Sequence, residues 1–329
     1  MDKKELSEVW GSELVRSYKI ILDVIKKSLT QTLNYRGRLE PNVNFAQKDS
    51  IELSQIDGGT MIMLDHPSSI NYIEMEICCC TPSYYIEVSI DKYSWFRVVD
   101  HSNYDCRSIQ RLWINRIYVR YIRIVETKNT SKKIKFLKVM YNTDKLHLVE
   151  IKNGLVAPKY NVALSSMDAI VINGIPNTFI RHMAKYTPST MQDSILNDDY
   201  KHYYKYRGYL YHYLNRGCIE VQLAQPYLLS SMRMLLWDHN NDTYDYTVHV
   251  SVNHKDWDII IDKSNKSCRS WQLLQFEQRL VVYIRITGVQ TSNDDRSFNL
   301  VYLEAPAQVS LASIITKPWK SMVWLLNRK

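Results

Sequence analysis

The stretch Tyr283-Ile284-Arg285-Ile286 repeats, residue for residue, the earlier stretch Tyr121-Ile122-Arg123-Ile124. The separation is 162 residues (285 − 123), and the same offset relates Cys106-Arg107-Ser108 to Cys268-Arg269-Ser270. It holds without a gap from residue 85 to residue 136 and falls to 159 further upstream. A period of this length is too long for a solenoid repeat and indicates a duplicated domain.

Each copy has the pattern of half-buried β-strands. Aliphatic residues occupy every second position of residues 85–90 and again of residues 247–252. A period of two places these side chains on one face of a strand. Turn-forming segments such as Asp238-His239-Asn240-Asn241-Asp242 separate the strands. Several short strands with little helical periodicity predict a mainly β chain with a β-sandwich in each copy.

The composition excludes several classes of protein. The 329 residues are 45% hydrophobic and include 24 Tyr but only 9 Gly, which argues against disorder and against a Gly-rich nucleotide-binding enzyme. The net charge is +8, and the basic residues form no run. The sequence shows no apolar stretch of roughly 18 residues and no secretory signal, so we expect a cytoplasmic protein with free thiols.

The two ends of the chain differ from the repeats. In residues 4–30, apolar residues recur at spacings of three or four, which predicts an amphipathic helix. The chain therefore divides into a helical segment (1–32), a shortened first copy (33–149), a second copy (150–306) and a tail (307–329).

Four blocks of the second copy resemble the discoidin (F5/8 type C) domain family. They are Glu220–Pro226, Leu235–Asp238, Cys268–Gln272 and Tyr283–Ile286, and the first copy carries the sister pattern. The resemblance implies tandem discoidin-like (galactose-binding-like) β-sandwiches of the jelly-roll type. The preceding helix resembles the end of a BACK domain, as in the BTB/POZ adaptors that carry paired discoidin domains.

The resemblance also implies a function. Such adaptors recognise targets for Cullin-3 ubiquitin ligases, so the chain is expected to be non-enzymatic and to bind proteins, ubiquitination targets among them. The BTB domain and most of the BACK domain have no counterpart in this sequence, so Cullin-3 binding is not expected of this chain. The alternative is a lectin-type discoidin domain that binds carbohydrate or anionic phospholipid.

The first copy is shorter than the second. Ala46 and Gly58 are 12 residues apart, whereas the aligned Ala163 and Gly217 are 54 apart. The missing residues would hold early strands and a ligand-facing loop, and their loss exposes part of a sheet. We therefore expect the first copy to pack on the second copy or on the helix at residues 4–30.

Residues 200–213 form the candidate contact surface, because tyrosines alternate there with Lys and Arg. With the nearby turn, the candidate partner-binding residues are Tyr200, Tyr203, Tyr204, Tyr206, Arg207, Tyr209, Trp237, Asp238 and Asp242. The competing interpretation is that the rings cap the open end of the sandwich. No nucleic-acid-binding motif is present, so no nucleic-acid partner is expected.

The remaining residues that could take part in catalysis or metal binding have structural interpretations. Cys106 and Cys268 are expected to be small buried side chains, and Trp95 and Trp257 are expected in the cores. Asp238-Asn240-Asp242 imitates a calcium loop but lacks its Gly, which predicts a polar turn. No zinc-ligand spacing and no catalytic motif occurs, so we expect no metal, no cofactor and no enzymatic activity.

Overall fold

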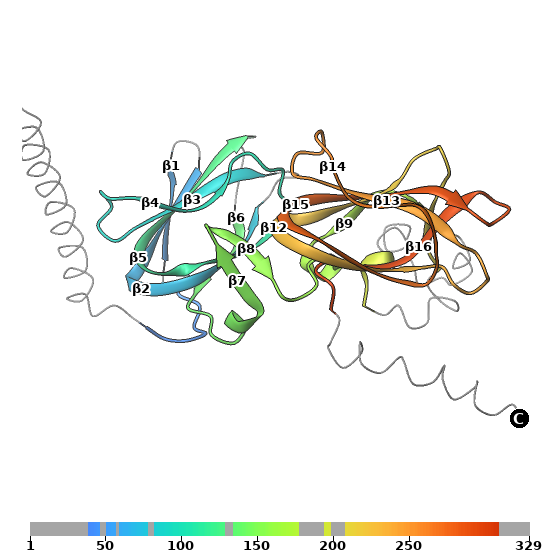
Figure 1. Ribbon diagram of the computed structural model, residues 1–329. Coiled ribbons are helices and arrows are strands. Elements are labelled where there is room, and N and C mark those ends of the chain that lie inside the picture. The colour runs from blue at the N-terminus through green and yellow to red at the C-terminus, as the bar shows by residue number, and fades with distance from the viewer. Residues whose placement is uncertain are drawn as a thin grey trace, which may run out of the picture.

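The computed structural model describes residues 39–46, 51–56, 59–77, 82–128, 134–177, 194–198 and 208–308. Within these ranges the chain is mainly β, and two antiparallel sheets lie side by side along it (Figure 1). The predicted N-terminal helix and all but two residues of the predicted tail lie outside the described residues. The four segment boundaries stay predictions.

The first sheet contains six strands. Its order is β1 (Ile51–Ile56), β2 (Gly59–Ile77), β5 (Ile109–Lys128), β3 (Ser83–Ser89) and β4 (Phe96–His101), while β6 (Ile134–Met140) pairs with β2. The register of β2 against β5 shifts between Met63 and Ser68. Such bulges bend a strand, and both halves of β2 contribute buried residues to one core.

The second sheet contains eight strands. Its order is β10 (Ile175–Pro176), β11 (Leu210–Tyr213), β16 (Ser297–Glu304), β12 (Ile219–Leu236), β15 (Trp271–Thr291), β13 (Tyr244–Ser251) and β14 (Asp258–Cys268), while β9 (Ile170–Asn173) pairs with β12. The hairpin of β7 (Val149–Lys152) and β8 (Leu155–Pro158) contacts both β5 and β12. Short 3-10 turns lie at Leu146–Leu148, Ser165–Met167 and Ser194–Leu196.

The two sheets share one pairing pattern. β2 pairs with β5 and β6 as β12 pairs with β15 and β16, and β3 lies between β4 and β5 as β13 lies between β14 and β15. Ser54 of β1 pairs with Met61 of β2, and Asn173 of β9 pairs with Glu220 of β12, where Met61 and Glu220 are related by the 159-residue offset. The duplication is therefore structural, and we call the six-stranded sheet with its core the first unit and the eight-stranded sheet with its core the second unit. Strands β10 and β11 have no counterpart in the described part of the first unit.

The first unit packs on the second, as predicted. The backbone N–H of Arg107 donates to the Ala224 carbonyl (2.8 Å), and that of Arg111 donates to Gln225 Oε1 (2.9 Å). Tyr72, Trp113 and Met140 of the first sheet are buried in one cluster with the core of the second unit, whereas the rest of the first unit has its own core. Burial of these three side chains stabilises the junction.

Two pairs of equivalent residues test the expectations for the cores. Cys106 and Cys268 are buried free thiols, as predicted. The prediction that Trp95 and Trp257 are core residues is wrong, because both rings are only half-buried on the outer face of a sheet. Arg123 stacks on Trp95 (4.2 Å to the ring centroid) and Arg285 on Trp257 (3.7 Å), an arrangement that the attraction between a cation and a ring face explains.

Candidate functional site

Four aromatic rings form a continuous row on the second unit, which we call the aromatic ladder: Trp237, Tyr209, Tyr211 and Tyr213. The ring centroids are 4.6 Å apart for Trp237 and Tyr209, 6.2 Å for Tyr209 and Tyr211, and 5.5 Å for Tyr211 and Tyr213. The strand period creates the row, because the intervening Leu210 and His212 point into the core. The side chains that face outward from β11 are therefore all aromatic.

A groove of about 240 Å³ lies at the three tyrosines of the aromatic ladder. Tyr209, Tyr211 and Tyr213 form one side, and Asp295, Ser297 and Asn177 complete it. Burial raises the pKa of Tyr209, and the carboxylates of Asp295 and Asp242 raise it further. Burial likewise raises the pKa of Tyr211, to which its neighbour Tyr213 adds. Tyr209 and Tyr211 are thus protonated at neutral pH, and their hydroxyl groups serve as hydrogen-bond donors and acceptors.

The chemistry of the groove favours particular ligands. Ring faces attract cations and the apolar faces of sugars or side chains, and the carboxylate of Asp295 accepts hydrogen bonds. An anionic group would be repelled by Asp295, which lines the groove, and by Asp242, whose charge also acts on Tyr209. The groove therefore suits a ligand that carries positive charge or several hydroxyl groups.

The structure brings together part of the predicted site. Tyr209, Trp237 and Asp242 lie at the groove or beside it, and the Asp238 carbonyl accepts a hydrogen bond from Arg269 Nη2 (2.9 Å). Asp242 also accepts a hydrogen bond from Asn240 Nδ2 (2.6 Å), which fits the predicted polar turn. The other candidates, Tyr200, Tyr203, Tyr204, Tyr206 and Arg207, lie outside the described residues.

Sequence reasoning missed Asp295, Ser297 and Asn177. The pairing of β11 with β16 brings the first two to the tyrosines, and Asn177 follows β10 on the other side of β11. These contacts join residues that are far apart in the sequence. The Asp294-Asp295 turn before a strand was visible in the sequence, but its neighbour across the sheet was not.

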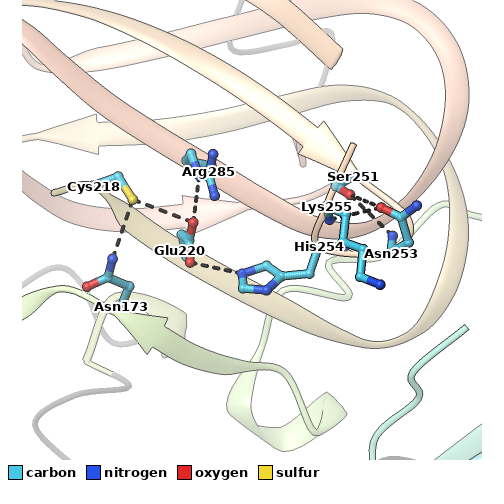
Figure 2. Close-up of polar contacts among 8 residues, drawn as sticks. All are labelled: Asn173, Cys218, Glu220, Ser251, Asn253, His254, Lys255 and Arg285. Carbon is cyan, nitrogen blue, oxygen red and sulfur yellow. Dashed lines mark hydrogen bonds and ion pairs between the residues drawn. The ribbon is translucent and has the colours of Figure 1, made fainter. Parts of the chain in front are cut away.

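A second polar cluster surrounds Glu220 on the outer face of the second sheet (Figure 2). Arg285 Nε donates to Glu220 Oε1 (2.5 Å), His254 Nε2 lies 3.2 Å from Glu220 Oε2, and the Cys218 thiol donates to Oε1 (3.5 Å). Burial raises the pKa of Glu220, but the hydrogen bonds and charges of Arg285 and His254 outweigh this effect, so the pKa is lowered overall. Burial, with the charge of Glu220, raises the pKa of Cys218 to about 11.

The Glu220 cluster is therefore a structural ion-pair network. A thiol with so high a pKa is a poor nucleophile, and both Glu220 oxygens are already paired. Among the described residues, no group of three or more His, Cys, Asp or Glu side chains is arranged to hold a metal ion. No helix in the described part of the chain is long and apolar enough to cross a membrane.

The fold and the groove define a tandem β-sandwich protein with a partly exposed aromatic surface on its second unit. The sequence is homologous to the C-terminal part of BTB/POZ domain-containing protein 9. It is 36% identical to that protein of Rattus norvegicus and of Homo sapiens over 94% of this chain and 54% of theirs. For the Drosophila melanogaster protein, the identity is 38% over 77% of this chain and 33% of the relative.

The chain thus spans about half the length of the mammalian relatives it matches. No family model matches the sequence. Solved structures similar to it include a family 89 glycoside hydrolase from Clostridium perfringens (20% identity, TM-score 0.32, 42% of this chain and 14% of that one). A CBM32 domain from Clostridium perfringens in complex with GalNAc-β-1,3-galactose is also similar (12% identity, TM-score 0.31, 42% of this chain and 94% of that one).

Proposed function

We propose that the chain is a non-enzymatic binding module that recognises protein partners through the aromatic ladder and its groove. The observation that carries the proposal is the row of Tyr209, Tyr211 and Tyr213 beside Asp295, because Tyr supplies large, stiff contact area and the carboxylate selects for positive charge. A partner segment with Lys or Arg side chains fits this chemistry. Tyr204, Tyr206 and Arg207 remain predicted contact residues.

The homology supports a wider role. We propose that the two units are discoidin-like and act as the target-recognition part of a cytoplasmic Cullin-3 ubiquitin-ligase adaptor, with the bound proteins as ubiquitination targets. The homology to BTB/POZ domain-containing protein 9 over 94% of the chain supports it.

The alternative function is lectin-like binding. Aromatic rings beside hydrogen-bonding side chains also suit a sugar. The apolar face of a sugar stacks on an aromatic ring, and its hydroxyl groups donate hydrogen bonds to a carboxylate. Asp242 and Asp295 oppose an anionic phospholipid at the same groove. Carbohydrate is therefore the stronger form of the alternative.

The test replaces Tyr211 and Tyr213 with Ala in the full chain, because Tyr213 is 45% exposed and both side chains point away from the core. Proteins retained by the wild type are quantified by mass spectrometry, and binding to a glycan array and to phosphatidylserine vesicles is measured in parallel. We expect partner capture to fall at least tenfold, since central Tyr residues contribute roughly 2 kcal/mol each.

Tyr93→Ala is the matched control, because Tyr93 is 91% exposed on the first unit. It should leave capture unchanged. Equal capture by the wild type and the double variant would refute the protein-binding proposal at this groove. Glycan binding that disappears only in the double variant would establish the lectin function instead.

A further inference from the structure

A larger cavity, of about 620 Å³, lies between the first sheet and the chain that leads to the second unit. Its floor consists of two cross-strand rows on adjacent strands β6, β2 and β5. Met140, Tyr72 and Trp113 form an apolar row, and Lys138, Glu74 and Arg111 form a charged row. Cavities of this size at the junction of two units are typical of small-molecule sites.

The apolar part of the cavity could hold a ring or a short carbon chain. The rings of Tyr72 and Trp113 are 4.8 Å apart and are buried on the side of the second unit. The facing wall consists of Leu148, Met167 and Tyr160, which belong to the connecting segment between strands β6 and β9. The walls therefore combine flat aromatic surface with flexible aliphatic side chains.

The charged row leaves one cation without a partner. Glu74 is already paired, because its Oε1 lies 3.4 Å from Arg111 Nε and its Oε2 accepts a hydrogen bond from Tyr72 (3.1 Å). The side chain of Lys138, on the other side of Glu74, forms no hydrogen bond or ion pair with any described residue. Lys145 lines the same cavity and likewise has no side-chain partner within the described ranges.

The equivalent row of the second unit shows that the excess positive charge is a property of the first unit alone. There Arg233 stands between Glu304 and Leu273. Arg233 donates two hydrogen bonds to the Glu304 carboxylate (2.9 Å and 2.6 Å), so the row is neutral and paired. In the first unit, two cations flank a single carboxylate instead.

Arg111 adds an unsatisfied donor to the cavity wall. Its Nη1 is buried and has no hydrogen-bond partner among the described residues, although its Nη2 donates to the Ser166 carbonyl (3.3 Å). A buried donor left unpaired is costly. The one other carboxylate of the wall, Asp144, accepts a hydrogen bond from Asn42 (2.8 Å), so the walls hold three cations and two carboxylates.

We propose that this cavity binds a small organic anion, with its carboxylate or phosphate group at Lys138, Lys145 and Arg111 and its apolar body along Met140, Leu148 and Trp113. An anion supplies the acceptors that these three donors lack, and charge-assisted hydrogen bonds are the strongest available for that purpose. The site is separate from the aromatic ladder and does not depend on the function proposed for it.

Isothermal titration calorimetry of the full chain tests the site with three probes: phenyl phosphate, phenylacetate and benzyl alcohol. Both anions share a ring with the neutral alcohol, so a difference between them and the alcohol reports the charged group. We expect saturable binding of at least one anion at low ionic strength, weakening as salt is added, and no saturable binding of benzyl alcohol. The stronger anion identifies the preferred group.

Lys138→Gln and Lys145→Gln are the variants of choice, because neither ammonium group holds the described fold together. Each should weaken binding of the anion about tenfold, and Arg111→Gln should weaken it at least as much. Lys159→Gln, on the same connecting segment but outside the cavity, is the matched control and should bind as the wild type does. The proposal is overturned if neither anion binds, if benzyl alcohol binds equally well, or if Lys138→Gln and Lys145→Gln leave the affinity unchanged.

Discussion

His101 shows how a single buried side chain makes the fold sensitive to acid. The Tyr84 hydroxyl donates to Gln110 Oε1 (2.7 Å), so its oxygen accepts from the Nδ1–H of a neutral His101 (3.1 Å). Burial lowers the pKa of His101 to about 4, although Asp100 raises it slightly. Lys263 stands at the equivalent position of the second unit, so only the first unit has this feature.

The resulting pH dependence has a definite sign. Above about pH 6.5, His101 is neutral in both the folded and the unfolded chain and has no effect on stability. Between about pH 6.5 and 4 only the unfolded chain takes up the proton, so the contribution of His101 falls by about 1 kcal/mol per pH unit. Urea unfolding at pH 7, 5.5 and 4.5 measures this loss.

His101→Gln removes the titration while keeping a hydrogen-bond donor. We expect its free energy of unfolding to fall less between pH 6.5 and 4 than that of the wild type. The exposed His147, changed to Gln, is the control and should retain the wild-type profile. A steep acid dependence that persists in His101→Gln would assign the loss to other groups.

At the scale of strands, the sequence predicted what is local. The alternation in residues 85–90 and 247–252 appears in β3 and β13, where Ile86, Val88, Val248 and Val250 are all buried. The position of β11 could not be predicted, because its neighbours β10 and β16 are set by long-range pairing. For the same reason, half of the groove beside the tyrosines escaped sequence analysis.

Trp95 and Trp257 show a different limit. A large aromatic side chain is most often buried, and composition alone favours the core. Each ring instead lies under an arginine on the outer face, where the guanidinium is held by a carboxylate from Glu87 in one unit and Glu220 in the other. Whether an aromatic residue is in the core or under a cation depends on neighbours that the sequence does not place.

The close approach of β15 and β16 at Gly288 gives a prediction at this scale. A Cβ at residue 288 would lie 2.3 Å from the Cβ of Phe298, which is buried in the core. Gly288→Ala should therefore force the strands apart and lower the free energy of unfolding by about 1–3 kcal/mol. Equilibrium urea unfolding at pH 7 measures the change.

Val289→Ala is the control for that substitution. Val289 follows Gly288 on the same strand and is 43% exposed, so its truncation should change the stability by less than about 0.5 kcal/mol. Equal stability of the Gly288 and Val289 variants would mean that β16 moves aside at little cost.

Hydrogen bonds between the two units form a polar junction in the molecule. Ala224 accepts hydrogen bonds from the Arg107 backbone (2.8 Å) and from Gln110 Nε2 (2.9 Å), and Gln222 Nε2 donates to the Asp105 carbonyl (2.9 Å). Because Gln110 also accepts from Tyr84, the junction is continuous with the polar chain that reaches His101. We therefore expect the stability of the first unit to be coupled to its contact with the second.

Gln225→Ala tests this coupling in the intact chain. Gln225 is buried, and its Oε1 accepts from the backbone N–H of Arg111 in β5 (2.9 Å), so truncation leaves that donor unpaired at a cost of about 1–3 kcal/mol. Hydrogen exchange followed by mass spectrometry should then show faster exchange in β2 and β5 while β13 and β15 keep their protection. Gln290→Ala, at an exposed position of the second unit, should leave both units as they are. If Gln225→Ala leaves exchange in β2 and β5 unchanged, or accelerates both units equally, the first unit does not rely on this contact.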